Sequence, residues 1–355
     1  MKLPHRTLVP LLAAVLATAT GTPAAADPAT GTYATLAGLG SATTDHVQNA
    51  LAGTIGGGWL ATWNARYGSD TIQTRATGCE FPRPRTPADA RLALRASHEG
   101  RFGARYRGLD ITGCVDFVGA AAYDPDVPAF PAPARTLTYV PFGVDALSYA
   151  VSNHSDLPDN LTFVQLQRIY RCLTSAVGGV AVTPLLTPPG SDTRTVWLER
   201  MGVSEADLAA GDYPCLGRTI EEHDAVPLAG HVDHLMPFAA SQWIAQQNAA
   251  ALLAETGVVI SDRRAGAVLG RVDGRSPVSA AGTQDLGFQP RLQHDVYTVV
   301  PSDLLDSPYV SHMFVGPNAA VCEEWALIRK LGFGFRYTTV DATHQGCGDA
   351  VHQGN

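Results

Sequence analysis

The chain has 355 residues, of which 45% are hydrophobic and 16% charged, and its formal net charge is −8. This length predicts about two domains in a globular protein. An acidic chain without a block of basic residues is a poor candidate for nucleic-acid binding, so we exclude that class of partner. Beyond the N-terminal segment, no apolar run is long enough to span a bilayer, and we expect no membrane-spanning segment.

The first 26 residues have the pattern of a secretory signal peptide. Lys2 and Arg6 give a basic start, an apolar stretch covers 8–17, and Ala24-Ala25-Ala26 offers a small-residue cleavage site. No cysteine lies near that site, so a lipid anchor is not expected. We therefore predict a secreted mature protein that begins at Asp27.

The first half of the mature chain alternates between apolar strands and amphipathic helices. The predicted elements, in order, are a strand over 32–38, helices over 45–52 and 87–97, and strands over 114–119 and 139–151. Such alternation predicts a mostly parallel α/β sheet. The strand over 139–151 is apolar almost throughout, which indicates that both of its faces are covered. The proline-rich segment 124–133 is expected to be a surface loop.

The second half continues with a helix over 161–171, for which Asp159 or Asn160 is the expected cap. An apolar run over 180–186 ends in a Pro-Pro-Gly turn, after which a helix opens at Ser191. A long helix is predicted over 237–253. The chain beyond Thr256 is expected to contain strands and loops before a final helix over 326–332.

Three helix starts share small hydroxyl residues. Gly190-Ser-Asp-Thr-Arg is echoed by Gly40-Ser-Ala-Thr-Thr-Asp, and a third start is Thr86-Pro-Ala-Asp. The first turn of a helix has unpaired N–H groups, and together with the helix dipole these form a site for an anionic or strongly polar ligand. Ordinary helix capping is the alternative for each start taken alone. The candidate ligand-binding residues are Thr43, Thr44, Thr86, Ser191, Asp192, Thr193 and Arg194.

Six cysteines in an exported chain favour disulfide bonds. Pairing each cysteine with its neighbour in sequence keeps every loop inside one region of the chain. The predicted pairs are Cys79–Cys114, Cys172–Cys215 and Cys322–Cys347.

The order of motifs along the chain resembles a known family. Val-Asp-Phe-Val-Gly is followed by Val-Pro-Phe-Gly-Val-Asp-Ala-Leu-Ser-Tyr-Ala-Val, Leu-Thr-Phe-Val-Gln-Leu-Gln-Arg-Ile-Tyr, Gly-Ser-Asp-Thr-Arg and Pro-Phe-Ala-Ala-Ser-Gln-Trp-Ile-Ala-Gln. This order resembles the PstS-like phosphate-binding proteins, which are periplasmic-type solute-binding proteins of ABC transporters, and in particular their secreted actinobacterial branch. The resemblance implies a two-lobed periplasmic-binding-protein-like (type II) α/β fold, with two crossover strands and an interlobe cleft. Lobe I would comprise 27–138 and 250–355, and lobe II 139–249.

The resemblance also implies a function. The protein would be a monomer that binds a small anion such as phosphate between its lobes and delivers it to an ABC transporter permease. In the family, a Ser-Asp pair follows the Asp-Phe-Gly strand, and its carboxylate accepts the proton of hydrogenphosphate. Here Ala121 and Ala122 stand after the equivalent strand, Thr187 replaces a family arginine, and Asp192 adds a carboxylate. The alternative is therefore the same fold with phosphate binding lost, in a secreted interaction or cell-surface protein.

The sequence also contains residues that could form a metal site or a hydrolase active site. The segment Glu221–His234 contains His223, Asp224, His231, Asp233 and His234, whose side chains are possible metal ligands. It matches no metal motif such as His-Glu-x-x-His, so we favour a solvated loop and predict neither metal nor cofactor. A hydrolase built on Ser191 is the weaker alternative, since the chain has no Gly-x-Ser-x-Gly motif, and we predict no enzymatic activity.

Overall fold

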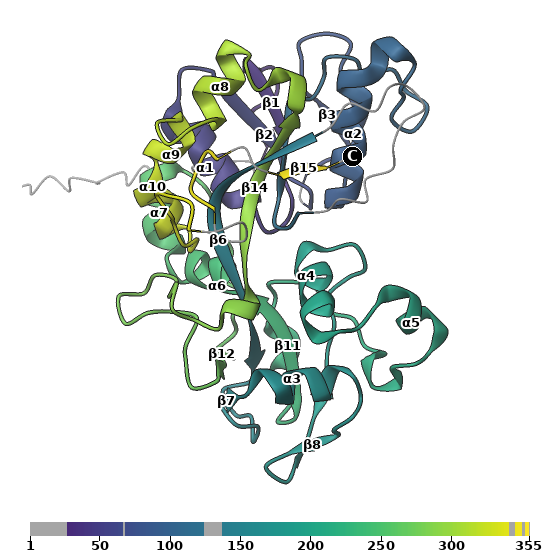
Figure 1. The fold of residues 1–355 in the computed structure, drawn as a ribbon, viewed down its shortest axis with the longest axis vertical. Helices are drawn as coiled ribbons and strands as arrows, with labels where there is room; N and C mark the ends of the chain where they lie inside the picture. Colours follow the sequence, from purple (N-terminus) through teal and green to yellow (C-terminus); the bar gives the residue numbers. More distant parts are fainter. Residues whose placement is uncertain (1–26, 67, 124–136, 341–344, 350–351, 355) are drawn as a thin grey trace, which may run out of the picture.

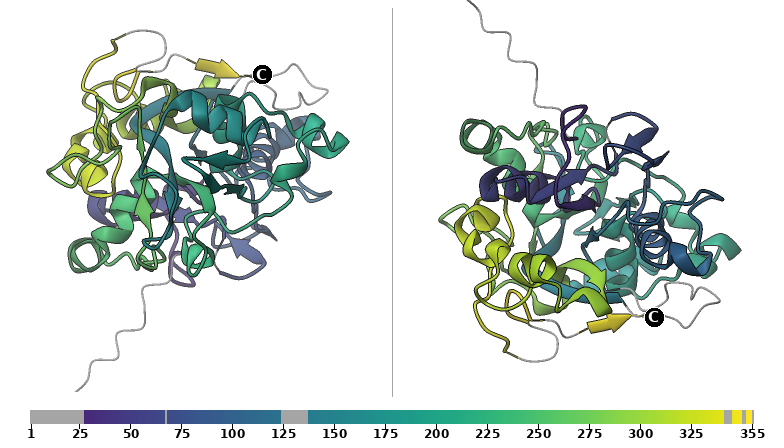
Figure 2. Two further views of the ribbon diagram at one scale, coloured as in Figure 1. Left: turned by 90° about the horizontal axis from the view of Figure 1, so that it is seen from below. Right: turned by 90° about the horizontal axis from the view of Figure 1, so that it is seen from above.

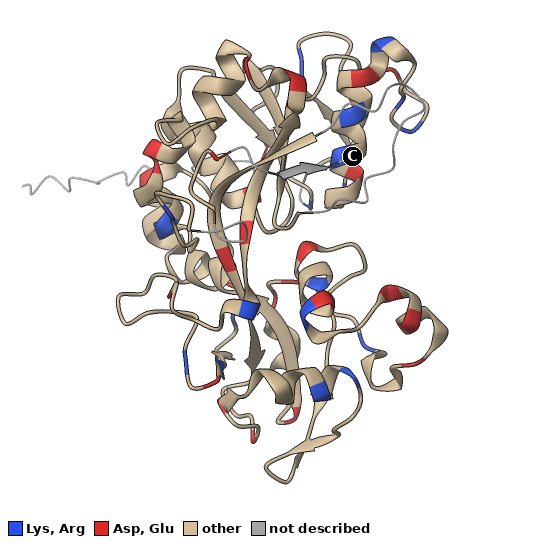
Figure 3. Ribbon diagram, viewed as in Figure 1, with Lys and Arg blue, Asp and Glu red and all other residues tan. Residues whose placement is uncertain are grey.

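Two lobes joined by long strands make up the computed structural model, which describes residues 27–66, 68–123, 137–340, 345–349 and 352–354 (Figure 1). The predicted signal peptide and the proline-rich segment 124–133 lie outside these residues. Figure 2 shows the same arrangement from below and from above, with helices surrounding the strands. Figure 3 shows acidic and basic residues interspersed over the described parts of both lobes.

A mixed sheet passes through both lobes. Among the described residues it has nine strands, in the order β10-β11-β6-β14-β5-β1-β2, with β12 and β15 also pairing with β6. Their bounds are β1 Leu36–Leu39, β2 Leu60–Trp63, β5 Phe117–Ala120, β6 Leu137–Val151, β10 Thr183–Pro184, β11 His234–Ala239, β12 Val268–Leu269, β14 Gln293–Pro301 and β15 His352–Gly354. The long apolar strand predicted over 139–151 is confirmed as β6, and all of its residues are buried. β6 and β14 are antiparallel neighbours that run from one lobe into the other (Figure 1).

The first lobe has helices on both faces of β1, β2 and β5. The helices α1 Asp45–Ile55, α8 Pro308–Phe314, α9 Ala320–Glu323 and α10 Trp325–Lys330 pack into one hydrophobic cluster. On the opposite face, α2 Pro87–Glu99 contributes Ala90 and Leu94 to a second cluster, which includes Val118 of β5. A sheet covered on both faces explains why its strands are apolar throughout rather than alternating.

The second lobe has its own core around Trp197, which is fully buried and lies edge-on to Tyr170. Its elements are β7 Asn160–Leu161, α3 Phe163–Tyr170, β8 Ala176–Val177, β9 Val180–Ala181, α4 Asp192–Met201, α5 Glu205–Ala210 and β13 Arg271–Val272. The segment 268–292, which we expected in lobe I, packs here: Val272 and Phe288 belong to this core, and β13 pairs with β7. The chain therefore returns to the second lobe after α7 and before β14 crosses back.

Two helix predictions need correction. The helix expected over 237–253 begins only at Ala240, because the first three residues of this apolar run belong to β11 and pair with β6; the helical part is divided into α6 Ala240–Gln247 and α7 Ala249–Thr256. The helix expected from 161 begins at Phe163, and its cap is Thr162, which forms a capping box with Gln165. Helices α8 and α9 lie in the region for which we predicted only strands and loops before the final helix.

Short elements complete the described chain. They are the hairpin strands β3 Thr71–Gln73 and β4 Glu80–Pro82, and the 3₁₀ helices Gly100–Phe102, Pro214–Leu216, Val226–Leu228, Pro290–Leu292 and Ser302–Leu304. None of the helices in the described ranges combines the length and apolar character that crossing a bilayer requires.

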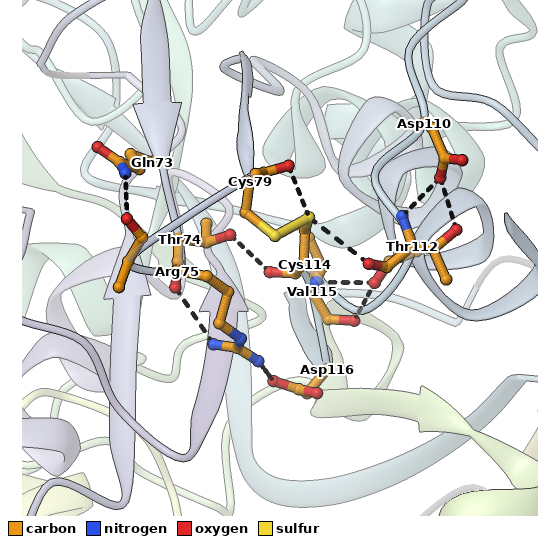
Figure 4. Close-up of a disulfide and its surroundings, with 12 residues drawn as sticks. Gln73, Thr74, Arg75, Cys79, Asp110, Thr112, Cys114, Val115 and Asp116 are labelled. Atoms are coloured by element: carbon orange, nitrogen blue, oxygen red, sulfur yellow. Dashed lines mark hydrogen bonds and ion pairs between the residues drawn. A yellow bond between two sulfur atoms is a disulfide. The ribbon is translucent and has the colours of Figure 1, made fainter.

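All six cysteines lie within the described residues, and the three predicted disulfides are confirmed. Figure 4 shows how Cys79–Cys114 ties the β3–β4 hairpin to the segment that leads into β5. Thr74 Oγ1 donates to the carbonyl of Cys114 at 2.7 Å, and Arg75 forms an ion pair with Asp116. Since Asp116 also accepts from the N–H of Ala37 in β1, this cluster links β1 to the segment that leads into β5.

Candidate functional site

Three helix starts meet between the lobes. α1 and α2 belong to the first lobe, and α4 of the second lobe begins directly across from α2 (Figure 1). A cavity of about 440 Å³ lies there, lined by Ala42 before α1, Thr86 at the start of α2, and Ser191 and Asp192 at the start of α4. The structure thus brings together residues that lie far apart in sequence, as the shared pattern of the three helix starts suggested.

The hydroxyl groups at these starts are partly engaged in capping. Thr86 Oγ1 accepts from the N–H of Asp89 at 3.2 Å, and Ser191 Oγ accepts from the N–H of Arg194 at 3.3 Å. The α1 start differs, because the Thr44 hydroxyl accepts from the N–H of Ser41 instead of capping its own helix. Capping and ligand binding are compatible at α2 and α4, since a cap satisfies only one of the unpaired N–H groups of a first turn.

Not every predicted residue reaches the cavity. Thr43, Thr44, Thr193 and Arg194 are buried beside it but are not among its lining residues. Thr43 Oγ1 is buried and has no hydrogen-bond partner among the described residues, while the carbonyl of Thr43 accepts from Gln242 in α6.

Asp192 places a carboxylate at the junction of the lobes. It is 6% exposed and lines the cavity, and its Oδ2 has no hydrogen-bond partner in the described part of the chain. Burial raises the pKa of this carboxyl to about 7; nearby Glu222 adds to the rise, whereas the Ser41 hydroxyl and Arg91 oppose it. The side chain is therefore a buried acceptor with capacity for a hydrogen-bond donor.

An ion pair across the lobes was not predicted. Arg66, which follows β2 in the first lobe, donates to Glu222 Oε1 at 2.7 Å and lies 3.0 Å from Glu221 Oε2 in the second lobe. All three residues line the cavity, together with Arg85, which donates to the carbonyl of Arg66 at 2.7 Å and to Asp70. The acidic segment containing Glu221 and Glu222 stood out in the sequence, but nothing in the sequence around Arg66 indicated its position.

From the wall of the cavity, Glu222 contacts two further buried groups, Thr193 and His223. Burial raises the pKa of Glu222, and Arg66 and Thr193 oppose that rise. Thr193 Oγ1 lies 3.1 Å from His223 Nε2. Burial, assisted by Arg66 and His46, lowers the pKa of His223 well below its usual range, so His223 is neutral at neutral pH.

Arg194 is directed away from the cavity. Its Nε and Nη2 donate to both carboxylate oxygens of Glu205 in α5, at 2.5 and 2.7 Å, and its Nη1 donates to the carbonyl of Thr187 at 3.0 Å. The sequence predicts that this guanidinium faces an anion; in the structure its donors instead connect α4 to α5 and to the turn before α4.

The group of possible metal ligands in the segment 221–234 is split. His231, Asp233 and His234 lie together, whereas Asp224 is paired with Arg263 and His223 faces Thr193. Within the cluster, His234 Nδ1 lies 2.8 Å from Asp233, and Arg218 donates to His234 Nε2 at 2.7 Å. A cation bound at His234 Nε2 would therefore have to displace the positively charged Arg218.

Comparison of the sequence with protein-family models gives no match, and comparison with curated proteins also gives none. Solved structures do match. An ABC-type phosphate transport receptor from Vibrio cholerae superposes with a TM-score of 0.52 at 15% identity, covering 85% of this chain and 100% of the receptor. A protein from Clostridium perfringens, described as a phosphate ABC transporter substrate-binding protein with bound phosphate, gives a TM-score of 0.50 at 11% identity, covering 83% of this chain and 97% of that one. The two-lobed α/β architecture of this chain is therefore the fold found in phosphate-binding proteins of the periplasmic-binding-protein type.

Proposed function

We propose that the protein binds a small oxyanion that carries a proton, with hydrogenphosphate as the leading form, in the cavity between its lobes. The observation that carries this proposal is the meeting of the α2 and α4 N-termini with Asp192 at one cavity. Helix N–H groups, the hydroxyl of Thr86 and the guanidinium groups of Arg66 and Arg85 supply donors for oxygen atoms, whereas the Ser191 hydroxyl donates to Thr187 Oγ1 at 3.0 Å and shapes the start of α4. Asp192 supplies one acceptor, which suits the single proton of hydrogenphosphate.

Asp192 would thereby replace the acid that the resembling family has after its Asp-Phe-Gly strand. It lies near the N–H of Ala121, at the point where this chain has alanine instead of that acid. The carboxylate would thus come from the second lobe instead of the first. Thr43, Thr44 and Thr193 would support the binding residues from behind, and Arg194 would fix α4 rather than contact the ligand.

Binding of an oxyanion between the lobes also suggests a role for the protein in transport. We propose that the protein is exported, acts without catalysis, and passes its ligand to an ABC transporter permease. The two solved structures described above support this role, since one is a transport receptor for phosphate and the other has phosphate bound. The three disulfides are consistent with an oxidising compartment.

Calorimetric titration of the phosphate-stripped mature chain with phosphate, and then with sulfate, tests the proposal. We expect micromolar or tighter binding of phosphate and much weaker binding of sulfate, which has no proton to donate to Asp192 at neutral pH. Asp192→Asn should weaken phosphate binding by about tenfold or more, because a hydrogen bond to a charged group is lost. The ratio of phosphate affinity to sulfate affinity should therefore fall in this variant. Asp207→Asn is the matched control, because Asp207 also lies in the first turn of a helix but is outside the cavity.

One observation favours a second candidate, a secreted interaction protein that has lost phosphate binding. Arg66 is already paired with Glu221 and Glu222, so less of its positive charge is available to an anion. The absence of heat and of any shift in melting temperature with phosphate, sulfate and other small anions would favour this candidate.

A further inference from the structure

A second hollow lies in the first lobe, away from the interlobe cavity. It has a volume of about 290 Å³ and lies beside the Cys322–Cys347 disulfide, where α9 meets α10. Its walls include Trp325 at the start of α10 and Phe335 and Tyr337, which follow that helix. None of the residues assigned to the interlobe cavity lines this hollow.

Three of the seven described residues that line this hollow are aromatic. Trp325 is 38% exposed and Tyr337 is 62% exposed, whereas Phe335 is buried behind them. The ring centroids of Trp325 and Tyr337 are 6.0 Å apart at 59°, and those of Phe335 and Tyr337 are 4.9 Å apart at 72°. Single exposed aromatic residues are ordinary on protein surfaces, but a contiguous group around a hollow is typical of a ligand site.

The charge of this pocket is acidic. Among the described residues that line it, Glu323 alone is charged, and its side chain is exposed. The basic residues of α10, Arg329 and Lys330, do not line the pocket, and Lys330 is paired with Glu255 at 2.7 Å. Both the carboxylate and the faces of the rings attract positive charge, and they disfavour an anionic ligand.

We propose that the pocket formed by Glu323, Trp325, Phe335, Tyr337 and the Cys322–Cys347 disulfide binds a small organic cation of the quaternary ammonium type. Such a cation has an apolar surface that the rings can contact and a diffuse charge that the ring faces and Glu323 can stabilise. The disulfide and the buried Phe335 form the fixed part of the wall, which reduces the ordering needed on binding. The small volume excludes a folded peptide as the occupant and suits a single headgroup.

Titration of the mature protein with choline, with binding monitored by ligand-observed NMR, tests this proposal. Dimethylbutanol, the uncharged carbon isostere of choline, is the matched ligand and should bind more weakly. Tyr337→Leu and Glu323→Gln should each weaken choline binding by roughly two- to fivefold, the range expected for one cation–π contact or one exposed charge. Tyr337→Phe should keep the affinity because the ring is retained.

Tyr309→Leu is the control for the loss of an exposed ring elsewhere, because Tyr309 is 51% exposed and packs on Trp59 outside the pocket. It should leave choline binding unchanged. Equal binding of choline and its isostere, stronger binding of a neutral sugar such as cellobiose, or no binding of choline would each overturn the proposal. The variants Tyr337→Leu and Glu323→Gln should leave phosphate titrations unaltered, so this proposal and the interlobe function can fail separately.

Discussion

Among single residues, Asp192 has a pKa of about 7 in the folded protein, against 3.8 for an ordinary aspartate, because burial disfavours its charged form. The folded state therefore binds this proton more tightly than the unfolded chain does. The resulting stabilisation is fully present below about pH 4 and is lost as the pH rises to about 7. The change across this window is on the order of 4 kcal/mol in the free energy of unfolding.

Asp192→Asn should remove this pH dependence. We expect the variant to be more stable than the parent protein at pH 8, and its advantage to shrink or disappear at pH 4. The buried histidines His46 and His223 titrate in the opposite sense, since their lowered pKa values favour the folded state at higher pH. They are common to both proteins, so the difference in melting temperature between parent and variant reports Asp192 together with its repulsion of Glu222. A difference that stays constant from pH 4 to pH 8 would contradict the raised pKa.

Arg194 should matter for stability and not for binding. Its guanidinium holds both oxygens of Glu205 and the carbonyl of Thr187, so Arg194→Ala should cost about 2 kcal/mol of the free energy of unfolding in urea. The phosphate affinity of the folded variant should be unchanged. Arg200→Ala is the control on the same helix. Arg200 Nη1 lies 3.3 Å from Oε1 of the exposed Glu199, and such a surface ion pair contributes about 1 kcal/mol or less to the free energy of unfolding. A large loss of phosphate affinity in Arg194→Ala would show that this residue takes part in phosphate binding.

At the scale of secondary-structure elements, two serine caps separate helix stability from ligand binding. Ser191 caps α4 at the cavity, and Ser204 caps α5 outside it, with its Oγ accepting from the N–H of Asp207 at 3.1 Å. Replacing either serine by alanine should cost about 1 kcal/mol in thermal or urea denaturation. Only Ser191→Ala should also weaken phosphate binding in calorimetry, because this cap orients the first-turn N–H groups of α4 that face the cavity. Equal phosphate affinities in the two variants would mean that Ser191 is a cap and nothing more.

The elements also show what a sequence can and cannot predict. The starts of α2 and α4 were predictable because a cap and the first turn are local in sequence, as at Thr86 and Ser191. A short apolar run such as the one that begins at Pro237 fits both the helical and the strand period, and the sequence alone favours a helix there. In the structure, pairing with β6 makes residues 237–239 part of a strand. Arg66 and Glu222 could not be placed, because their meeting depends on how the two lobes close.

For the molecule as a whole, residues of the two lobes touch beside the cavity, an arrangement that we call closed. β6 and β14 connect the lobes, and contacts between residues that line the cavity also join them. These contacts include the ion pair between Arg66 and Glu222 and the approach of Gly190 to Thr86. Closure of two lobes on connecting strands is a known mode of ligand-dependent motion, so these contacts should form and break as ligand binds and leaves.

A cysteine pair can test this closed arrangement directly. A Cβ atom built on Gly190 would lie 3.8 Å from Thr86 Cβ, and the Cβ atoms of a disulfide are about 3.8 Å apart. Thr86→Cys combined with Gly190→Cys should therefore form an interlobe disulfide, detectable by non-reducing peptide mapping, and should slow the entry and release of phosphate. Gly190 has a φ of +77°, so a side chain there costs roughly 1–2 kcal/mol, which the single variant Gly190→Cys measures on its own. Formation of the three native disulfides without the interlobe bond would show that the lobes do not spend enough time closed for these two residues to meet.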